Sequence, residues 1–303
     1  MSLNFLIVTP PHNTKSGGIM VLHDLCTALN KLNHKAGVVF ITAGSQDKQD
    51  FNFGYSNDVS LHDPEGTYYD FISGKSPEEV SNFVKNACII YPDIIQGNPI
   101  GARYFATYVL GVPKTPINPG YIISYFGFFF NNPNYILCKP FLSPCIHDQK
   151  TIHWSQRTLN LTYIGKATEK KGVAPVPGTV LVERNWPADK IQLGILLRNC
   201  KYFFTWDNLS ATNFDAVLCG ALPILMDDGY LPNDLVNQSE FGQFPKINYK
   251  SNMDLRSTPM NIIEIDETLN DMKNKIHQYN DSWLIQVDGL VSDLKKTLSI
   301  DEN

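Results

Sequence analysis

The stretch Tyr202 to Met226, YFFTWDNLSATNFDAVLCGALPILM, decides the fold class of this chain. Its first run, YFFTW, is apolar and aromatic and predicts a buried strand. Asp207 to Ser210 form a polar turn typical of a helix N-cap, and the helix that follows ends at Gly220. A second apolar run, ALPILM, predicts the next strand. Strand, helix and strand at this length indicate a βαβ unit, whose helix N-terminus lies at the ligand-binding edge of a parallel sheet.

Two acidic residues frame the start of this helix. Asp207 precedes the helix and Asp215 lies within its first turns, eight positions later. We therefore expect both carboxylates to face the same crevice, beside backbone N–H groups that attract phosphate. An acidic residue near a helix start is also a common N-cap, so this pattern alone does not define a site.

The rest of the chain alternates between strands and helices in the same way. We expect strands at 4–9, 36–42, 88–93, 114–119, 159–165, 179–184 and 261–265, and helices at 19–33, from 77, at 101–110 and at 188–199. The segment 140–160 is rich in Pro, Ser and His and predicts a domain boundary. We expect an N-terminal domain over 1–150 and a C-terminal domain over 151–303, with the last helix able to pack back on the first domain.

Composition narrows the class of protein. The 303 residues carry a net charge of −5, which gives no electrostatic footprint for nucleic acid. No apolar run approaches the roughly 20 residues that span a bilayer, and no signal peptide is evident. The six cysteines show no CxxC spacing and predict reduced core residues, so we expect a cytoplasmic protein with no metal site. The run at 121–130, YIISYFGFFF, indicates a buried strand; the alternative is peripheral docking on a membrane or on a lipid-linked substrate.

Glycine and lysine residues follow the first strand of each half. Gly17 and Gly18 lie between the first strand and the first helix, where a backbone can approach a phosphate or a sugar closely. In the second half, Lys166 and Lys171 flank the corresponding turn. Two cations beside a helix N-terminus would neutralise a diphosphate, and Asp207 and Asp215 would accept from sugar hydroxyls. The constellation suggests a nucleotide-sugar site.

The second half resembles the donor-binding domain of GT-B glycosyltransferases, specifically the retaining family with a Glu-x7-Glu motif. That family reads G-R, four residues, K-G, and here the corresponding residues are Gly165-Lys166 and Lys171-Gly172. The acidic pair is Asp207-x7-Asp215, followed by Ala216 and by Cys219-Gly220-Ala221-Leu222-Pro223. The segments ERNWP (183–187) and WDNLSATNFDA are similar to a bacterial polysaccharide subgroup. The resemblance covers 162–228 and implies an α/β, GT-B-like fold of two Rossmann-like αβα domains facing across a cleft.

The resemblance also implies a role for each matching residue. Lys166, Lys171 and Asp207 would be catalytic, the lysines on the leaving diphosphate and Asp207 near the reacting carbon of the donor sugar. Asp215 would accept from the ribose hydroxyls. The remaining donor-binding residues would be Gly17, Gly18, Gly165, Arg184, Ser210, Ala211 and Thr212. The implied reaction moves a sugar from a nucleotide-diphosphate donor to a glycan or lipid-linked acceptor, without metal or other cofactor and with retention of configuration.

Some features leave alternatives open. Both family glutamates are Asp here, and Lys166 replaces an Arg, which loses a bidentate fork but keeps the charge. His12 and His23 are candidates on the acceptor side, and an inverting mechanism would need a base such as His12. A sugar-nucleotide epimerase shares the architecture, and a non-catalytic nucleotide-sugar-binding subunit belongs to another class.

Overall fold

The computed structural model describes residues 2–13, 16–42, 52–54, 65–113, 115–117, 119–143, 145–149, 152–226, 229–236, 246–247 and 262–299. The chain divides into two compact units, Met1–Lys139 with Asp281–Asn303, and Pro140–Asn280. The first division therefore falls about ten residues before the boundary expected at 150. The last helix belongs to the first unit, because the chain returns to that unit at Asp281.

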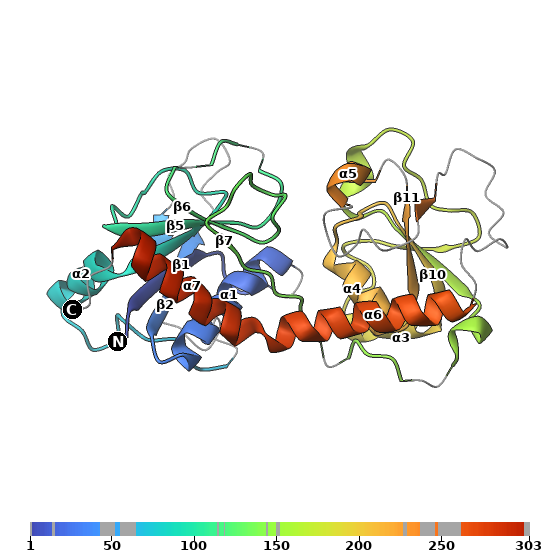
Figure 1. Cartoon of the computed structure of the whole chain (residues 1–303), viewed down its shortest axis with the longest axis horizontal. Coiled ribbons are helices and arrows are strands. Elements are labelled where there is room, and N and C mark those ends of the chain that lie inside the picture. Colours follow the sequence, from blue (N-terminus) through green and yellow to red (C-terminus); the bar gives the residue numbers. More distant parts are fainter. Residues whose placement is uncertain are drawn as a thin grey trace. The chain divides into compact units, whose positions relative to one another are not determined.

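The first unit is an α/β layer structure around one sheet (Figure 1). The strand order is β3-β2-β1-β4-β5-β6-β7, and each neighbouring pair is parallel except β2 with β3. The elements in chain order are β1 (Asn4–Thr9), α1 (Gly17–Lys31), β2 (Lys35–Thr42), β3 (Asn52–Gly54), α2 (Pro77–Asn86), β4 (Cys88–Pro92), β5 (Tyr104–Val109), β6 (Tyr121–Ser124), β7 (Tyr135–Ile136) and α7 (Trp283–Leu298).

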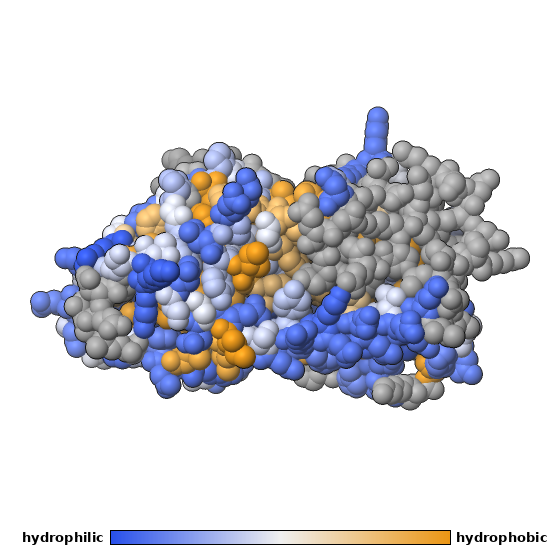
Figure 2. Space-filling view, viewed as in Figure 1, coloured by the Kyte–Doolittle hydropathy of each residue, from blue (hydrophilic) through white to orange (hydrophobic). Residues whose placement is uncertain are grey.

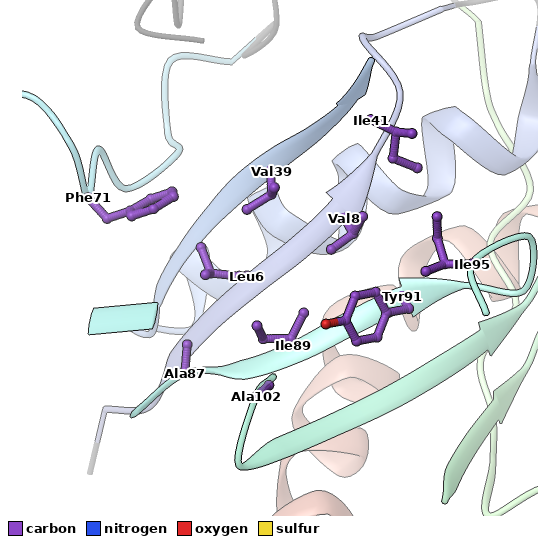
Figure 3. Close-up of a cluster of buried hydrophobic side chains, with 10 residues drawn as sticks. All are labelled: Leu6, Val8, Val39, Ile41, Phe71, Ala87, Ile89, Tyr91, Ile95 and Ala102. Carbon is purple, nitrogen blue, oxygen red and sulfur yellow. The ribbon is translucent and has the colours of Figure 1, made fainter. Parts of the chain in front are cut away.

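Side chains on one face of this sheet form a continuous apolar cluster. Leu6 and Val8 of β1 alternate with Phe5 and Ile7, which are buried on the opposite face. Burial on both faces is typical of parallel strands covered by helices, and it explains why β1 reads as an unbroken apolar run. Figure 3 shows the cluster, whose members are Leu6, Val8, Val39, Ile41, Phe71, Ala87, Ile89, Tyr91, Ile95 and Ala102.

The helix α7 completes the first unit by packing on α1 and β6. The Tyr135 hydroxyl donates to the carbonyl of Gln286 at 2.8 Å, and the Tyr121 hydroxyl donates to the Asp293 carboxylate at 2.5 Å. Gly289 faces the Tyr135 ring, where a Cβ atom would lie 3.5 Å from Cζ and closer still to the hydroxyl. The small residue thus allows close approach of helix and sheet.

The second unit has a smaller parallel sheet in the order β12-β11-β10-β8-β9. Its regular elements are β8 (Leu159–Tyr163), β9 (Val180–Val182), α3 (Lys190–Asn199), β10 (Cys200–Thr205), α4 (Ala211–Leu218), β11 (Leu222–Met226), α5 (Asn233–Val236), β12 (Lys246–Ile247) and α6 (Ile262–Asp281). The predicted βαβ unit is confirmed as β10-α4-β11. This strand order places the carboxyl ends of β9, β8 and β10 side by side. Figure 2 shows that the visible side of α6 is covered by polar residues.

Three sequence-based assignments were wrong. The segment 101–110 is not a helix, because Tyr104–Val109 forms the strand β5 between β4 and β6. Its aromatic and β-branched residues suit a strand that is buried in the sheet. The segment 261–265 is not a strand where it is described, because Ile262 begins α6 and Ile265 continues the apolar stripe of Leu269, Met272 and Ile276. The strand expected at 114–119 is absent from its described residues, 115–117 and 119.

A buried arginine joins several loops of the second unit. Arg157 is 5 % exposed and donates to the carbonyl of Cys219 at 2.9 Å, at the end of α4. It also donates to the Asp148 carboxylate at 3.2 Å, which Lys273 of α6 contacts at 3.1 Å. Gly220, with φ of 78°, turns the chain beside this cluster, where a Cβ atom would lie 2.8 Å from the guanidinium. Arg157 therefore satisfies helix-end carbonyls that would otherwise be buried without a donor.

The aromatic and cysteine-bearing segments are mostly part of the core. Tyr121–Ser124 is buried, and in the turn that follows, Phe126 and Phe129 are 7 % and 6 % exposed. The buried-strand interpretation of this run is therefore confirmed for Tyr121–Ser124, whereas the residues after Ser124 form a turn. All six cysteines are free thiols, and five of them are buried. None of the helices in the described ranges is long and apolar enough to cross a membrane.

Candidate functional site

The candidate site lies at the carboxyl edge of the smaller sheet, where the turns after β8 and β10 meet. The carboxylate of Asp207, just beyond β10, accepts a hydrogen bond from the backbone amide of Lys166 at 2.9 Å. Asp207 is 1 % exposed, and burial raises the pKa of its carboxyl, while the charges of Lys166 and Arg184 act in the opposite direction. Its other oxygen, Oδ1, is buried and has no hydrogen-bond donor among the described residues.

Gly165 makes this contact possible. Its φ is 55°, in the left-handed region that favours glycine. A Cβ atom here would lie 2.6 Å from the Cβ of Asp207 and 2.7 Å from the Tyr163 ring. The glycine of the G-K motif is thus required both by the backbone conformation and by the approach of Asp207. It allows the turn η3 (Gly165–Glu169) to sit directly on the end of β10.

The start of α4 adds hydroxyl groups to the same edge. Ser210 is the N-cap, and its side chain accepts from the Thr212 amide at 3.2 Å. The Tyr163 phenol lies beside both hydroxyls: Ser210 and Thr212 lower its pKa, while burial, the larger effect, raises it. Ala211, the first residue of α4, is exposed. Positive helix-end charge and three hydroxyl groups therefore converge at one point.

A tight turn after β9 carries a cation and an exposed aromatic ring. Glu183 and Trp186 exchange backbone hydrogen bonds of 2.8 Å and 3.2 Å, which closes the turn around Arg184. Burial raises the pKa of both Asp207 and Tyr163, and the charge of Arg184 acts in the opposite direction on each of them. Trp186 is 44 % exposed, although most large apolar side chains of this unit are buried.

The turn after β11 closes the other side of the site. Asn208 holds it with two hydrogen bonds to the backbone of Leu231, at 2.8 Å and 2.9 Å. The Lys166 ammonium lies over the Tyr230 ring, 5.4 Å from its centroid. Lys170 donates to the carbonyl of Gly229. These contacts anchor the lysine-bearing turn at both ends, with the Lys166 side chain still exposed.

The predicted donor-site residues of this unit fall into three groups. The structure brings together Gly165, Lys166, Arg184, Asp207, Ser210, Ala211 and Thr212. Lys171 is exposed, and in the described part of the chain no hydrogen bond or ion pair joins it to this cluster. Asp215 is buried on α4 and pairs with Lys190, the first residue of α3. Contact of Asp207 with the donor sugar stays a prediction, since its carboxylate holds the turn.

The predicted residues of the first unit lie at the carboxyl edge of the larger sheet. Gly17 and Gly18 begin α1, and a Cβ atom on Gly18 would meet only Leu110 at 3.6 Å. His23 is 1 % exposed, and its ring bonds the Tyr68 hydroxyl at 2.9 Å and the Pro10 carbonyl at 3.0 Å. His12 is half-buried and lies edge-on to His23, with ring centroids 5.1 Å apart. His23 is therefore too enclosed to touch an acceptor, whereas His12 is partly accessible.

Sequence reasoning missed three residues. Tyr163 ends a strand, and a strand-end tyrosine carries no signal of its own. Trp186 lay within the quoted ERNWP segment, but its exposure becomes evident only in the structure. Lys190 had a readable signal, because a cation at the first position of a helix opposes the macrodipole and calls for an anionic partner.

The whole chain is similar in fold to solved glycosyltransferases. The calicheamicin glycosyltransferase CalG4 matches with a TM-score of 0.51 and 10 % identity, over 98 % of this chain and 99 % of that one. The glycotransferase of kitacinnamycin matches with a TM-score of 0.50 and 8 % identity, over 96 % and 99 %. These similarities establish an α/β, GT-B-like fold and nothing finer.

Other comparisons add little to this assignment. A Listeria monocytogenes protein, provisionally named a UDP-N-acetylglucosamine 2-epimerase, matches with a TM-score of 0.46 and 12 % identity, over 100 % of this chain and 98 % of that one. That match is too distant to decide between transfer and epimerisation. No protein-family model matches the sequence, and no curated protein sequence matches it.

Proposed function

We propose that this chain is a glycosyltransferase that moves a sugar from a nucleotide-diphosphate donor to a glycan or lipid-linked acceptor. One observation carries the proposal: Lys166, Arg184 and the start of α4 converge at the carboxyl edge of the smaller sheet. Two cations and a helix N-terminus match a diphosphate, which carries two or three negative charges. The GT-B-like fold is consistent with this ligand class.

The surrounding residues fit the rest of a nucleotide. The exposed indole of Trp186 offers a face on which a nucleobase would stack. Asp215, on the next turn of α4, supplies a carboxylate for ribose hydroxyls. Lys171 would engage the diphosphate from the exposed end of its turn. Donor binding by Gly17 and Gly18 stays a prediction of the family resemblance.

In the proposed reaction, the leaving diphosphate accepts the proton of the acceptor hydroxyl, and the sugar keeps its configuration. The bond from the anomeric carbon to the diphosphate breaks as the bond to the acceptor oxygen forms on the same face. Lys166 and Arg184 stabilise the negative charge that develops on the leaving group. Inversion is the alternative, with His12 as the base that takes the acceptor proton.

A non-catalytic binding subunit is the second candidate, and one observation favours it. Asp207, the residue expected nearest the reacting carbon, is 1 % exposed and is engaged with the backbone of Lys166. Such a carboxylate supports a binding turn without taking part in chemistry. The two candidates share the nucleotide site and differ only in turnover.

A thermal-shift panel of UDP, GDP, dTDP, ADP and CMP tests the nucleotide site. A ligand present at 100 times its Kd should stabilise the folded chain by about 2.7 kcal/mol. If none of the five shifts Tm, the proposed site is wrong. With the base known, incubation with the corresponding nucleotide sugars separates an enzyme from a binder, and NMR of the anomeric proton separates retention from inversion.

A further inference from the structure

Asp215 and Lys190 form an ion pair that the proposed site must accommodate. The Asp215 side chain is 4 % exposed, and its Oδ2 accepts from the ammonium of Lys190. The Lys190 side chain is 40 % exposed, so the ammonium lies between the buried carboxylate and solvent. Any ligand hydroxyl that reaches this carboxylate therefore meets Lys190 as well.

The position of Lys190 on its helix carries an electrostatic cost. It is the first residue of α3, where a cation faces the positive end of the macrodipole. The preceding N-cap, Asp189, already accepts from the Gln192 amide at 2.8 Å. Capping thus does not require a charged residue at 190, and the contact that Lys190 makes is the one with Asp215.

We propose that Lys190 is a positioning residue for nucleotide binding: its ammonium fixes the Asp215 carboxylate on the second turn of α4, where the carboxylate accepts a hydrogen bond from the ribose of the donor. This inference rests on the proposed function and assigns a residue to it. Lys190 would act through Asp215 and would not take part in the chemical step.

The electrostatics around Asp215 support this role. Burial raises the pKa of the Asp215 carboxyl, and Lys190 is the group that opposes this shift. The nearby Cys219 thiol stays neutral at pH 7, because burial raises its pKa to about 12. Without Lys190 the carboxyl would take up a proton at a higher pH, and a protonated carboxyl is a weaker acceptor for a hydroxyl. Lys190 therefore widens the pH range in which Asp215 serves as an acceptor.

Calorimetric titrations with ribo- and 2′-deoxyribonucleotides test the proposal. The probes are UDP with dUDP, and GDP with dGDP, measured between pH 5.5 and 8.0 on the full chain. The wild type should favour one ribonucleotide over its deoxy partner by roughly tenfold, the value of one hydrogen bond to a charged group. Lys190→Met should bring this ratio close to one and move the acid limit of binding to higher pH. Lys190→Arg should restore both.

Matched variants separate positioning from general charge effects. Lys275→Met makes the same change on α6, and it should leave the ratio and the pH profile as in the wild type. If Lys190→Met does not fold, Lys190→Gln takes its place under the same criteria. An unchanged ratio and pH profile in the folded variant would overturn the inference, as would tighter binding, which would mark the ammonium as an obstacle. If no nucleotide binds the wild type, the proposed function fails, and this inference fails with it.

Discussion

The carboxylate of Asp207 and the backbone amide of Lys166 are joined by a hydrogen bond of 2.9 Å, across 41 positions of sequence. This bond fixes the turn after β8 against the end of β10, and Gly165 is the residue that lets the two approach. A diphosphate site at this edge depends on that junction, since it sets the direction of the Lys166 amide and side chain.

Gly165→Ala should destabilise the chain and abolish nucleotide binding. The alanine would have to adopt the left-handed backbone conformation of Gly165, which costs about 1–2 kcal/mol of stability. Its methyl group would also overlap Asp207 and Tyr163, at a further cost of about 1–3 kcal/mol. Gly178→Ala is the matched control, with φ of 76° and open space around its Cβ position. Urea unfolding should show the control to be the less affected of the two. Equal losses of stability in the two variants would show that the close approach of Asp207 does not require glycine at position 165.

Asp207→Asn and Asp207→Ala should differ. The amide of Asn keeps an oxygen that can accept from Lys166, whereas Ala leaves the partly buried Lys166 N–H without this acceptor, at a cost of about 1 kcal/mol. Because burial raises the folded-state pKa of Asp207, its stabilising contribution is present at low pH and falls as pH rises from its ordinary value of about 3.9 through the raised value. Urea unfolding between pH 4 and 7 should show a flatter slope for Asp207→Asn. A slope equal to that of the wild type would contradict this picture.

Lys166→Met should weaken binding of the nucleotide identified by the thermal-shift panel about tenfold, the equivalent of ~1.4 kcal/mol. The ammonium lies at the rim of the cluster over Tyr230, where it can reach a phosphate. Lys171→Met tests the second lysine of the motif at an exposed position outside the cluster. If both lysines bind the diphosphate, as the family resemblance implies, the double variant should bind the nucleotide more weakly than either single variant in calorimetry. If Lys166→Met binds the nucleotide as tightly as the wild type, Lys166 does not contact the phosphates and the proposed site loses its main cation.

Trp186 gives a direct optical test of the nucleobase position. The other three tryptophans, Trp154, Trp206 and Trp283, are at most 5 % exposed, so accessible indole fluorescence comes from Trp186. A stacking nucleotide should quench this emission and protect it from acrylamide. Trp186→Phe should remove the signal but keep most of the affinity, and Trp186→Ala should weaken binding roughly tenfold. Quenching that persists in Trp186→Phe would place the base elsewhere.

Arg157→Met should be among the most destabilising single changes in the second unit. It removes the donor to the Cys219 carbonyl and leaves Asp148 with Lys273 as its remaining cation in this network, at a cost of about 3 kcal/mol. Arg198→Met is the control, since Arg198 donates to the Cys145 carbonyl at 2.9 Å and should cost about 1 kcal/mol. Urea unfolding followed by circular dichroism compares the two. Similar losses would argue against Arg157 as the centre of this network.

Local sequence patterns were enough to predict the βαβ unit β10-α4-β11 and to pick out residues that lie together at the carboxyl edge of the smaller sheet. Apolar runs such as Asn4–Thr9 and Leu222–Met226 are buried on both faces of parallel strands, so their pattern is local and readable. Gly165 and Asp207 were each picked out by their places in the two motifs of the family resemblance, and they meet because the carboxyl ends of neighbouring parallel strands share one edge of the sheet.

The partners of the individual side chains became evident only in the folded chain. Tyr104–Val109 forms a strand because it pairs with β4 along one edge and with β6 along the other, although its local pattern also suited a helix. Asp215 was expected to be open to a ribose, yet Lys190 reaches it from another helix. Asp207 turns toward the backbone of Lys166 and is buried there. Such pairings depend on distances between segments far apart in the chain, and a local sequence pattern carries no record of those distances.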